Sequence, residues 1–327
     1  MEDFTMKKKI MSMLFAGVLA AGMLAGCGDS ADTATDAGAD TAGTETYGAQ
    51  DAAQPEAGSE AAGEFDAAEY VSVYSREDGS GTRGAFIELF GIEEKDESGE
   101  KIDNTTVEAV ITNSTDVMLT SVAGNTYGIG YVSLGSLDES IVKAVKIDGA
   151  EATVENIKSG TYAIARPFNI ATSGEVSEAA QDFINYIMSA DGQAVVTESG
   201  YIGSDEGAAF ASNGAEGKVV IGGSSSVAPV MEKLIEAYKA LNPNVTIELQ
   251  TSDSTTGMTG AMDGTLDIGM ASRELKDTEL EGGLTGTEIA MDGIAVIVNP
   301  ANPAEDLSSE NVKGIFTGEI TNWDGLN

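Results

Sequence analysis

Residues 75–90 read SREDGSGTRGAFIELF, a small polar turn that leads directly into an apolar helical pattern. Ser80, Gly81 and Thr82 fall where the first turn of a helix leaves backbone N–H groups without intrahelical partners, so this turn can hold an anion. Arg76 adds a positive charge just before the turn. The helix is expected to be anchored to a core by residues at helical spacing, Ala85, Phe86, Leu89 and Phe90. A capped helix without any ligand would leave the same local pattern.

Two further stretches share this order of a strand, a Ser/Thr/Gly turn and a helix start. One contains Ser225 and Ser226, and the other runs from Ser254 to Gly257. Strands that alternate with helices predict an α/β fold, in which such turns lie at the carboxyl ends of the strands, where ligands bind. Hydroxyl groups and helix N-termini from different lobes would then surround a tetrahedral oxyanion.

The composition excludes several classes of function. The chain has 327 residues, a formal net charge of -37, no histidine and a single cysteine, Cys27. This charge argues against binding to nucleic acid or to an anionic membrane surface. The chain lacks a Walker lysine after Gly-Ser-Gly-Thr, a histidine for serine catalysis and a carboxylate cluster with metal-ligand spacing. We therefore expect no enzyme activity, no cofactor and no metal.

The N-terminal segment predicts export. Three lysines, Lys7 to Lys9, precede an apolar run over residues 10–25, and Leu-Ala-Gly-Cys ends at Cys27. This ending resembles the lipobox of bacterial lipoproteins, in which the cysteine receives lipid; a buried free cysteine is the alternative. Residues 1–27 are thus expected to be a signal peptide, with translation beginning at Met1 or Met6. Residues 28–64, acidic and rich in small residues, are expected to form a disordered tether.

Several longer stretches resemble the phosphate-binding lipoproteins of bacterial ABC phosphate importers, also called PstS. The resemblance covers nearly all of residues 70–327. The matching segments are Ser75-Arg-Glu-Asp-Gly-Ser-Gly-Thr-Arg, Ile129-Gly-Tyr-Val-Ser-Leu-Gly, Ala165-Arg-Pro-Phe, Gly223-Ser-Ser-Ser-Val-Ala-Pro, Asp263-Gly-Thr-Leu-Asp-Ile-Gly-Met-Ala-Ser-Arg, Asp292-Gly-Ile-Ala-Val-Ile-Val-Asn-Pro and Ile315-Phe-Thr-Gly-Glu-Ile-Thr-Asn-Trp.

The order of these segments departs from the family pattern. In the family the Ser-Val-Ala-Pro segment comes first and Gly-Ser-Gly-Thr follows Ile-Thr-Asn-Trp, whereas here the later half precedes the earlier half. The chain therefore looks like a circular permutant, joined through residues 203–217 and cut between Trp323 and Val71. A misassembled or truncated gene is the alternative.

The resemblance implies a two-lobed type II periplasmic-binding-protein fold with a hinge and a ligand cleft between the lobes. Carried onto this segment order, residues 166–297 would form lobe I. Residues 65–165 together with 298–327 would form lobe II. The two hinge crossings are expected near Arg166-Pro167 and near residues 298–300.

By the same resemblance, the phosphate contacts fall on residues from all three turns. Asp78 would orient Arg76 through a salt bridge. Ser272 stands where some family members carry an aspartate that accepts a proton from bound phosphate, and its hydroxyl can both donate and accept. The expected phosphate-binding residues are Arg76, Ser80, Gly81, Thr82, Ser225, Ser226, Ser254 and Ser272.

The resemblance implies a monomeric extracellular receptor, anchored to the bacterial cell membrane only through the lipid on Cys27. It would capture inorganic phosphate and deliver it to an ABC permease. Two alternatives remain open: a receptor for another tetrahedral oxyanion such as sulfate or molybdate, and a surface adhesion or sensor protein on the same fold.

Overall fold

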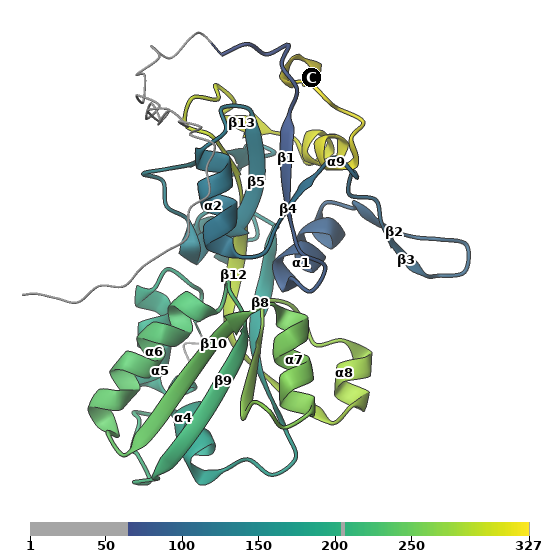
Figure 1. Ribbon diagram of the computed structural model, residues 1–327. Coiled ribbons are helices and arrows are strands. Elements are labelled where there is room, and N and C mark those ends of the chain that lie inside the picture. The colour runs from purple at the N-terminus through teal and green to yellow at the C-terminus, as the bar shows by residue number, and fades with distance from the viewer. Residues whose placement is uncertain (1–64, 204–206, 327) are drawn as a thin grey trace, which may run out of the picture. The chain divides into compact units, whose positions relative to one another are not determined.

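The computed structural model describes residues 65–203 and 207–326 (Figure 1). The expected signal peptide, the lipidation site Cys27 and the tether at 28–64 lie outside the described residues. Within the described part, no helix is long and apolar enough to cross a membrane.

One mixed sheet runs through the described chain in the order β10, β9, β11, β8, β12, β5, β1 and β4, with β6 beside β12. Its strands are β1 (Ser72–Arg76), β4 (Val110–Thr112), β5 (Gly128–Ser133), β6 (Lys143–Ala144), β8 (Ala165–Ser173), β9 (Gly217–Ser224), β10 (Val245–Ser252), β11 (Ile268–Ala271) and β12 (Leu284–Val298). Two short ribbons pair β2 (Glu93–Lys95) with β3 (Lys101–Asp103) and β7 (Lys146–Ile147) with β13 (Asp306–Leu307).

Helices cover this sheet on both lobes. They are α1 (Gly81–Leu89), α2 (Thr115–Ala123), α3 (Val154–Lys158), α4 (Glu178–Ile187), α5 (Ala190–Glu198), α6 (Ala228–Leu241), α7 (Ser254–Met262), α8 (Asp277–Glu281) and α9 (Ser309–Thr317), with 3-10 turns η1 (Leu134–Ser136) and η2 (Trp323–Gly325).

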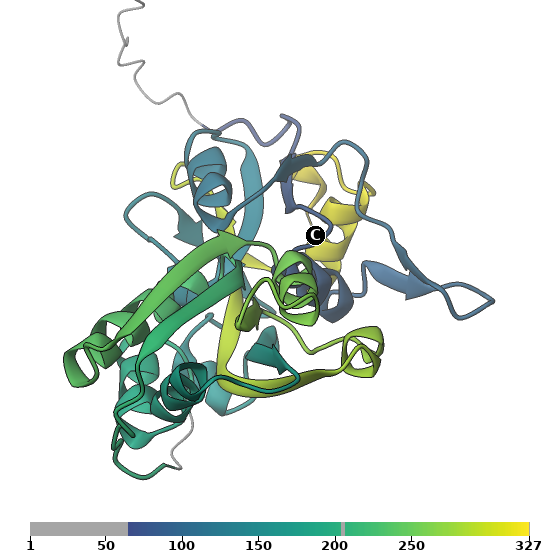
Figure 2. The same ribbon diagram turned by 60° about the horizontal axis from the view of Figure 1, so that its bottom comes forward.

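Two large hydrophobic cores divide the molecule into two lobes, as the fold class predicts. The core of lobe I is built from residues between Phe168 and Ala290. The core of lobe II combines residues from Val73 to Ile164 with residues from Ile294 onwards. In lobe II, Phe86 of α1 lies edge-on to Phe316 of α9, with ring centroids 4.7 Å apart, and the two helices are neighbours in Figures 1 and 2. Segments far apart in sequence thus share one core.

Two antiparallel strands, β8 and β12, carry the chain between the lobes (Figure 1). Along β8, Ile164 belongs to the core of lobe II and Phe168 to that of lobe I, so this strand passes between the lobes at residues 165–167. The second crossing lies at Gly293 and Ile294, because β12 pairs with β8 as far as Gly293 and with β5 from Ile294 onwards. The expected crossing near 298–300 is therefore too late in the chain: β12 stays extended in both lobes, and Pro300 only follows its end.

The first and last described segments lie side by side. The Val71 N–H donates to the Thr321 carbonyl at 2.8 Å, and the Asp324 N–H donates to the Ala67 carbonyl at 2.7 Å. The rings of Phe65 and Trp323 approach to 6.0 Å between centroids. The two edges of the cut that a circular permutation requires are thus in contact.

Residues 207–217 are held on lobe I rather than forming a loose linker. Asp182 on α4 accepts hydrogen bonds from the Ser212 hydroxyl at 2.8 Å and from the Asn213 N–H at 2.9 Å. The Tyr238 hydroxyl of α6 donates to the same carboxylate at 2.8 Å. The segment through which the two sequence halves are joined is therefore fixed to lobe I.

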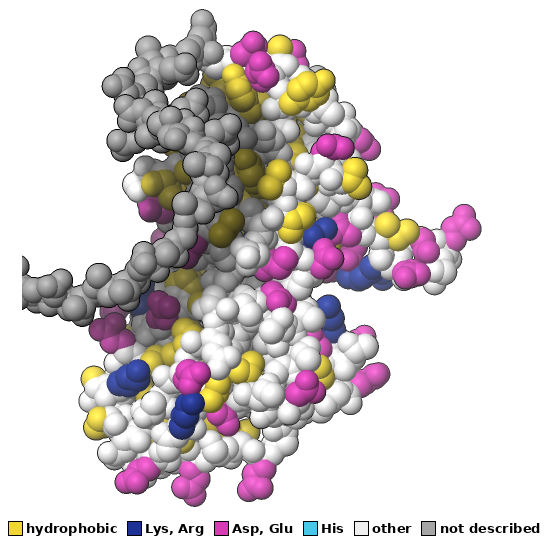
Figure 3. All heavy atoms as spheres, viewed as in Figure 1, with side chains coloured by type: hydrophobic (Ala, Val, Ile, Leu, Met, Phe, Trp, Pro, Cys, Tyr) yellow, Lys and Arg dark blue, Asp and Glu magenta, His cyan; other side chains and the backbone are white. Residues whose placement is uncertain are grey.

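The surface agrees with the strongly negative charge of the sequence. On the face seen in Figure 3, acidic side chains are spread over both lobes and basic side chains are sparse.

Candidate functional site

The Gly-Ser-Gly-Thr turn connects β1 to α1 in lobe II. Ser80 caps α1, because its hydroxyl accepts a hydrogen bond from the Arg83 N–H at 3.3 Å. The buried Tyr131 holds the end of β1: its hydroxyl accepts from the Arg76 N–H at 3.0 Å. Burial raises the pKa of Tyr131, so the phenol keeps its proton. The turn is thereby fixed to the core of lobe II.

The predicted anchor residues of α1 are only partly correct. Phe86 and Phe90 are buried, and Phe86 stacks on Tyr131 with ring centroids 3.9 Å apart. Leu89 is 39% exposed, and Ile87 is buried in its place. Leu89 lines a cavity beside the helix, so that side of α1 has no core to pack against.

A second helix of lobe II starts beside α1. β4 runs parallel to β1 with Thr112 opposite Arg76, so the carboxyl ends of the two strands are neighbours. Ser114 caps α2, because its hydroxyl accepts from the Val117 N–H at 3.2 Å. Thr115, the first residue of α2, therefore lies close to Arg76.

Lobe I presents three strand ends at the same place. β10 and β11 run parallel to β9 on its two sides, with Ser252 opposite Ser224. The residues after these strands are Ser225 and Ser226 before α6, Ser254 at the start of α7, and Ser272 after β11. Since all three strands end at one edge of the sheet, these hydroxyl groups converge, as the sequence predicts.

These residues form one buried group, here called the hydroxyl cluster: Thr82, Thr115, Ser224, Ser225, Ser226, Ser254 and Ser272. The Thr82 and Ser226 hydroxyls lie 2.7 Å apart across the two lobes. Within lobe I, the Ser224 hydroxyl donates to that of Ser272 at 3.0 Å, and the Ser272 N–H donates to the Ser254 hydroxyl at 3.1 Å. Neutral donors from both lobes thus face one another.

Arg76 joins the hydroxyl cluster through its guanidinium group, which is nearly fully buried. Its Nη2 donates to the Ser225 hydroxyl at 3.0 Å, and its Nη1 to the Thr115 hydroxyl at 3.4 Å. Four helices, α1, α2, α6 and α7, begin at this cluster. Their N-termini carry partial positive charge, so the arrangement attracts an anion without a large net charge.

The expected role of Asp78 is wrong in this structure. Asp78 pairs with Arg83 at 2.7 Å and its side chain is 96% exposed. Glu77 orients Arg76 instead: Nε donates to Oε2 and Nη2 to Oε1, both at 2.7 Å. Glu77 adjoins Arg76 in the chain and can form this bidentate pair without bending the turn.

Glycine is required at Gly81 because the two lobes approach closely there. A Cβ atom on Gly81 would lie 2.5 Å from the Ser254 hydroxyl oxygen and 2.8 Å from that of Ser272. Beside it, the Thr255 N–H donates to the Gly79 carbonyl at 3.2 Å, from one lobe to the other. The turn therefore brings its backbone, rather than a side chain, against lobe I.

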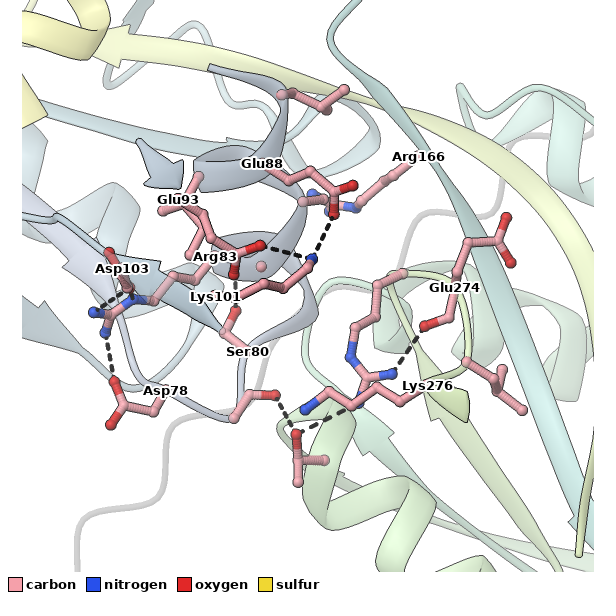
Figure 4. A pocket seen from close by; sticks show the side chains of 18 of the residues that line it. Asp78, Ser80, Arg83, Glu88, Glu93, Lys101, Asp103, Arg166, Glu274 and Lys276 are labelled. Atoms are coloured by element: carbon pink, nitrogen blue, oxygen red, sulfur yellow. Dashed lines mark hydrogen bonds and ion pairs between the residues drawn. The ribbon is translucent and has the colours of Figure 1, made fainter. Parts of the chain in front are cut away.

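A cavity of about 860 Å³ lies next to the cluster, between α1, the β2–β3 ribbon, the start of β8 and the segment before α8 (Figure 4). Its charged lining includes Arg83, which pairs with Asp78 and Asp103, and Lys101, which pairs with Glu88 and Glu93. Of the eight predicted phosphate-binding residues, only Ser80 lines this cavity. The cavity and the hydroxyl cluster are thus adjacent but distinct.

Sequence reasoning missed Thr115, Ser224 and Glu77. The Asn113-Ser-Thr-Asp stretch is recognisable as a helix start, but nothing local says that this start lies beside Arg76. That placement depends on the pairing of β4 with β1. Thr115 could have been found only by treating every strand-turn-helix unit as a candidate, whereas Glu77 and Ser224 stand in units that the sequence had already singled out.

Comparison with known proteins agrees with this architecture. A PBP superfamily domain matches residues 37–191 and 208–326. The chain is 51% identical over 322 residues to the phosphate-binding protein PstS 2 of Streptococcus agalactiae, across 98% of this chain and 99% of that protein. It is 47% identical over 261 residues to PstS 2 of Streptococcus pneumoniae, across 80% of this chain and 89% of that protein.

A solved structure is also similar. The crystal structure of a phosphate-binding protein of a phosphate ABC transporter from Streptococcus pneumoniae superposes with a TM-score of 0.63 at 47% identity, covering 79% of this chain and all of that one. Because the alignment to the Streptococcus agalactiae protein runs through nearly the whole of both chains, the segment order found here is shared with that relative. A misassembled gene does not explain an order that recurs in a second protein. The chain therefore belongs to the PBP superfamily and, within it, to the PstS family.

Proposed function

We propose that this protein is an extracellular receptor that captures inorganic phosphate and delivers it to an ABC importer. The observation that carries the proposal is the hydroxyl cluster, in which Arg76 and hydroxyl groups of both lobes meet at four helix N-termini. Relatives at 51% and 47% identity are phosphate-binding proteins, which supports the same ligand here. Binding needs no chemistry beyond charge and hydrogen bonds, so we propose a receptor rather than an enzyme.

The proposed contacts are those of the three turns together with Thr115. Arg76 would supply the positive charge and the hydroxyl groups the oriented donors, since charge-assisted hydrogen bonds to an oxyanion are stronger than neutral ones. The proposed phosphate-binding residues are Arg76, Ser80, Gly81, Thr82, Thr115, Ser225, Ser226, Ser254 and Ser272.

Ligand capture is proposed to proceed by closure of the lobes. In this proposal residues 166–293 move as one body and residues 65–165 with 294–326 as the other. The contact of Thr82 with Ser226 across the lobes would belong to the closed arrangement, which presents a combined surface to the permease and so couples binding to delivery.

Calorimetric titration of the purified full chain tests the ligand. We expect tight phosphate binding that sulfate does not displace and that Arg76→Ala abolishes or weakens at least about a hundredfold, since a charged hydrogen-bonding partner is lost. Lys233→Ala on the exposed side of α6 is the matched control and should bind as the wild type does. A folded wild-type protein that gives no heat with phosphate would refute the proposal.

A second tetrahedral oxyanion remains a candidate because of Ser272. Its hydroxyl lies 3.0 Å from that of Ser224 and can both donate and accept, so it does not select a protonated ligand. Sulfate or molybdate that displaces phosphate in the same titration would favour this second ligand.

Anchoring through Cys27 is part of the proposal. The basic start, short apolar run and Leu-Ala-Gly-Cys ending support it. In a bacterial host, labelled fatty acid should be incorporated into the wild type and not into Cys27→Ala. Equal labelling of both proteins would contradict the anchor.

A further inference from the structure

A buried ion pair joins the two strands that cross between the lobes. Arg166 on β8 lies opposite Asp292 on β12. Arg166 Nη2 is 3.1 Å from Asp292 Oδ2, and the side chains are 2% and 0% exposed. Along β8, Ile164 belongs to the core of lobe II and Phe168 to that of lobe I. The ion pair therefore lies between the two hydrophobic cores, at the hinge about which the lobes would move.

This ion pair is incompletely hydrogen-bonded. Asp292 Oδ1 accepts from the Ser133 hydroxyl at 2.9 Å and from the Gly135 N–H at 3.5 Å, both in lobe II. Arg166 Nε and Nη1 have no hydrogen-bond partner among the described residues, and the guanidinium carbon lies 5.4 Å from the centre of the Phe168 ring. Enclosing such a pair costs more free energy than the mutual attraction of the charges returns unless the remaining donors are satisfied.

The pKa values of the two side chains also indicate that burial disfavours their charges. Burial lowers the pKa of Arg166 to about 10 and raises the pKa of Asp292 to about 6, although each charge favours the ionised form of the other. The positive charge of Arg76 lowers the pKa of Arg166 further. The hinge arginine is thus repelled by the arginine of the proposed phosphate site.

The start of β8 borders the large cavity. The large cavity beside the hydroxyl cluster is lined by Ala165, Arg166 and Pro167 at the start of β8. Separation of the lobes would widen that cavity and hydrate the guanidinium group. An anion held by Arg76 would reduce the repulsion between the two arginines.

We propose that Arg166 and Asp292 are positioning residues of the hinge. Burying this ion pair costs free energy and so opposes closure of the lobes, until an anion bound at Arg76 offsets that cost. The inference rests on the proposed function, in which closure captures phosphate. It assigns a role in the open–closed balance to residues that do not touch the ligand.

The test compares the wild type with Arg166→Met/Asp292→Leu, which replaces the charges by apolar groups of similar size. Nitroxide labels are attached at Val107→Cys in lobe II and Lys239→Cys in lobe I, both exposed positions, in a full chain that carries Cys27→Ser. Pulsed electron paramagnetic resonance then measures the distance between the two lobes. We expect the unliganded distances to shorten in the apolar variant. We also expect its phosphate Kd to fall about tenfold or more, because less free energy is spent on closure.

Lys218→Met/Glu248→Leu is the control, since this ion pair joins β9 and β10 within lobe I and neither residue lines the cavity. It should leave the unliganded distances and the phosphate Kd unchanged. If the apolar hinge variant does not fold, Arg166→Gln/Asp292→Asn removes both charges with polar side chains and should shift both measurements in the same direction.

Unchanged distances and an unchanged Kd in the folded hinge variant would overturn the inference, as would a shift toward longer distances. If the wild type ignores phosphate, the proposed function fails, and the unliganded distances alone then decide the role of the hinge pair.

Discussion

Thr115 links three other members of the proposed site. Its hydroxyl lies 3.3 Å from that of Ser225 and 3.4 Å from that of Ser226, in the other lobe. It also accepts from Arg76 Nη1 at 3.4 Å. At the scale of single residues, this hydroxyl is placed to hold both Arg76 and an oxyanion.

We predict that Thr115→Val weakens phosphate binding about tenfold. The side chain keeps its size but loses one hydrogen bond, which contributes roughly 1.4 kcal/mol to the free energy of binding. Calorimetric titration measures the change. Thr115→Ser keeps the hydroxyl and should bind within a few-fold of the wild type. Equal affinities of the valine and serine variants would remove Thr115 from the site.

Gly81→Ala is predicted to hinder closure. The added Cβ would meet the Ser254 and Ser272 hydroxyls at 2.5 and 2.8 Å, which is closer than real contacts allow. We expect phosphate binding at least about a hundredfold weaker, with thermal stability close to that of the wild type, because the clash arises only between the lobes.

Gly84→Ala is the control for this substitution. Gly84 lies in the same helix, and a Cβ there would meet nothing within 4 Å. Alanine should stabilise α1 by about 0.5–1 kcal/mol and leave phosphate binding unchanged. If Gly81→Ala also binds normally, the lobes do not approach at this turn in the bound state.

At the scale of elements, Asp182 joins two helices to the segment at 207–217. Besides Ser212 and Asn213, it accepts from the Tyr238 hydroxyl and from the Asn242 side-chain amide at 2.8 and 3.2 Å. Burial alone would raise the pKa of Asp182, but these hydrogen bonds together lower it below its usual value. The segment that joins the two sequence halves is therefore fastened by a carboxylate of α4.

We predict that Asp182→Asn lowers the free energy of unfolding by about 2 kcal/mol, since charge-assisted hydrogen bonds are lost in a buried place. Chemical denaturation at pH 7 measures this. Glu232→Gln, on the exposed side of α6, should have almost no effect. A segment that resists proteolysis equally in both variants would contradict the role of Asp182.

The pH dependence follows from the sign of the shift. Because the pKa of Asp182 is lower in the folded protein than in the unfolded chain, its contribution is fully present above about pH 4 and is lost as the pH falls further. The difference in stability between the wild type and Asp182→Asn should therefore shrink in acid. A difference that stays constant down to pH 2 would contradict this account.

At the scale of the whole molecule, the segment order is unusual but the contacts are continuous. Residues 306–307 of β13 pair with β7, and α9 packs in the core with α1. The isolated bridge between Tyr70 and Asn322 joins the first described segment to the last. Lobe II is thus assembled from both ends of the described chain.

We predict that a chain with the two sequence halves exchanged keeps its fold and its phosphate binding. A chain of residues 207–326, a short glycine-serine linker and residues 65–203 should fold and bind phosphate within about tenfold of the original, because flexible loop closure costs little. Circular dichroism and calorimetry check fold and binding. The same rearrangement opened between Gly293 and Ile294 should not fold, because it cuts β12. An unfolded first variant would show that the present order is itself required.

Local sequence patterns predict the fold class and the chemical character of the candidate site. Turns such as Gly-Ser-Gly-Thr at 79–82 and Ser-Ser-Ser at 224–226 are local, and so are the strands and helices on either side of them. Since parallel strands end at a common edge of their sheet, the convergence of these turns also follows from local pattern and fold class. The family resemblance extended this to the two lobes.

Which residues contact one another depends on the folded arrangement of the strands. Glu77 rather than Asp78 holds Arg76 because the turn directs Asp78 outward to Arg83. Thr115 joins the cluster because β4 pairs with β1, and the second crossing lies at Gly293 because β12 changes partners there. These outcomes depend on strand register and on packing between segments distant in sequence, for which the local sequence carries no signal.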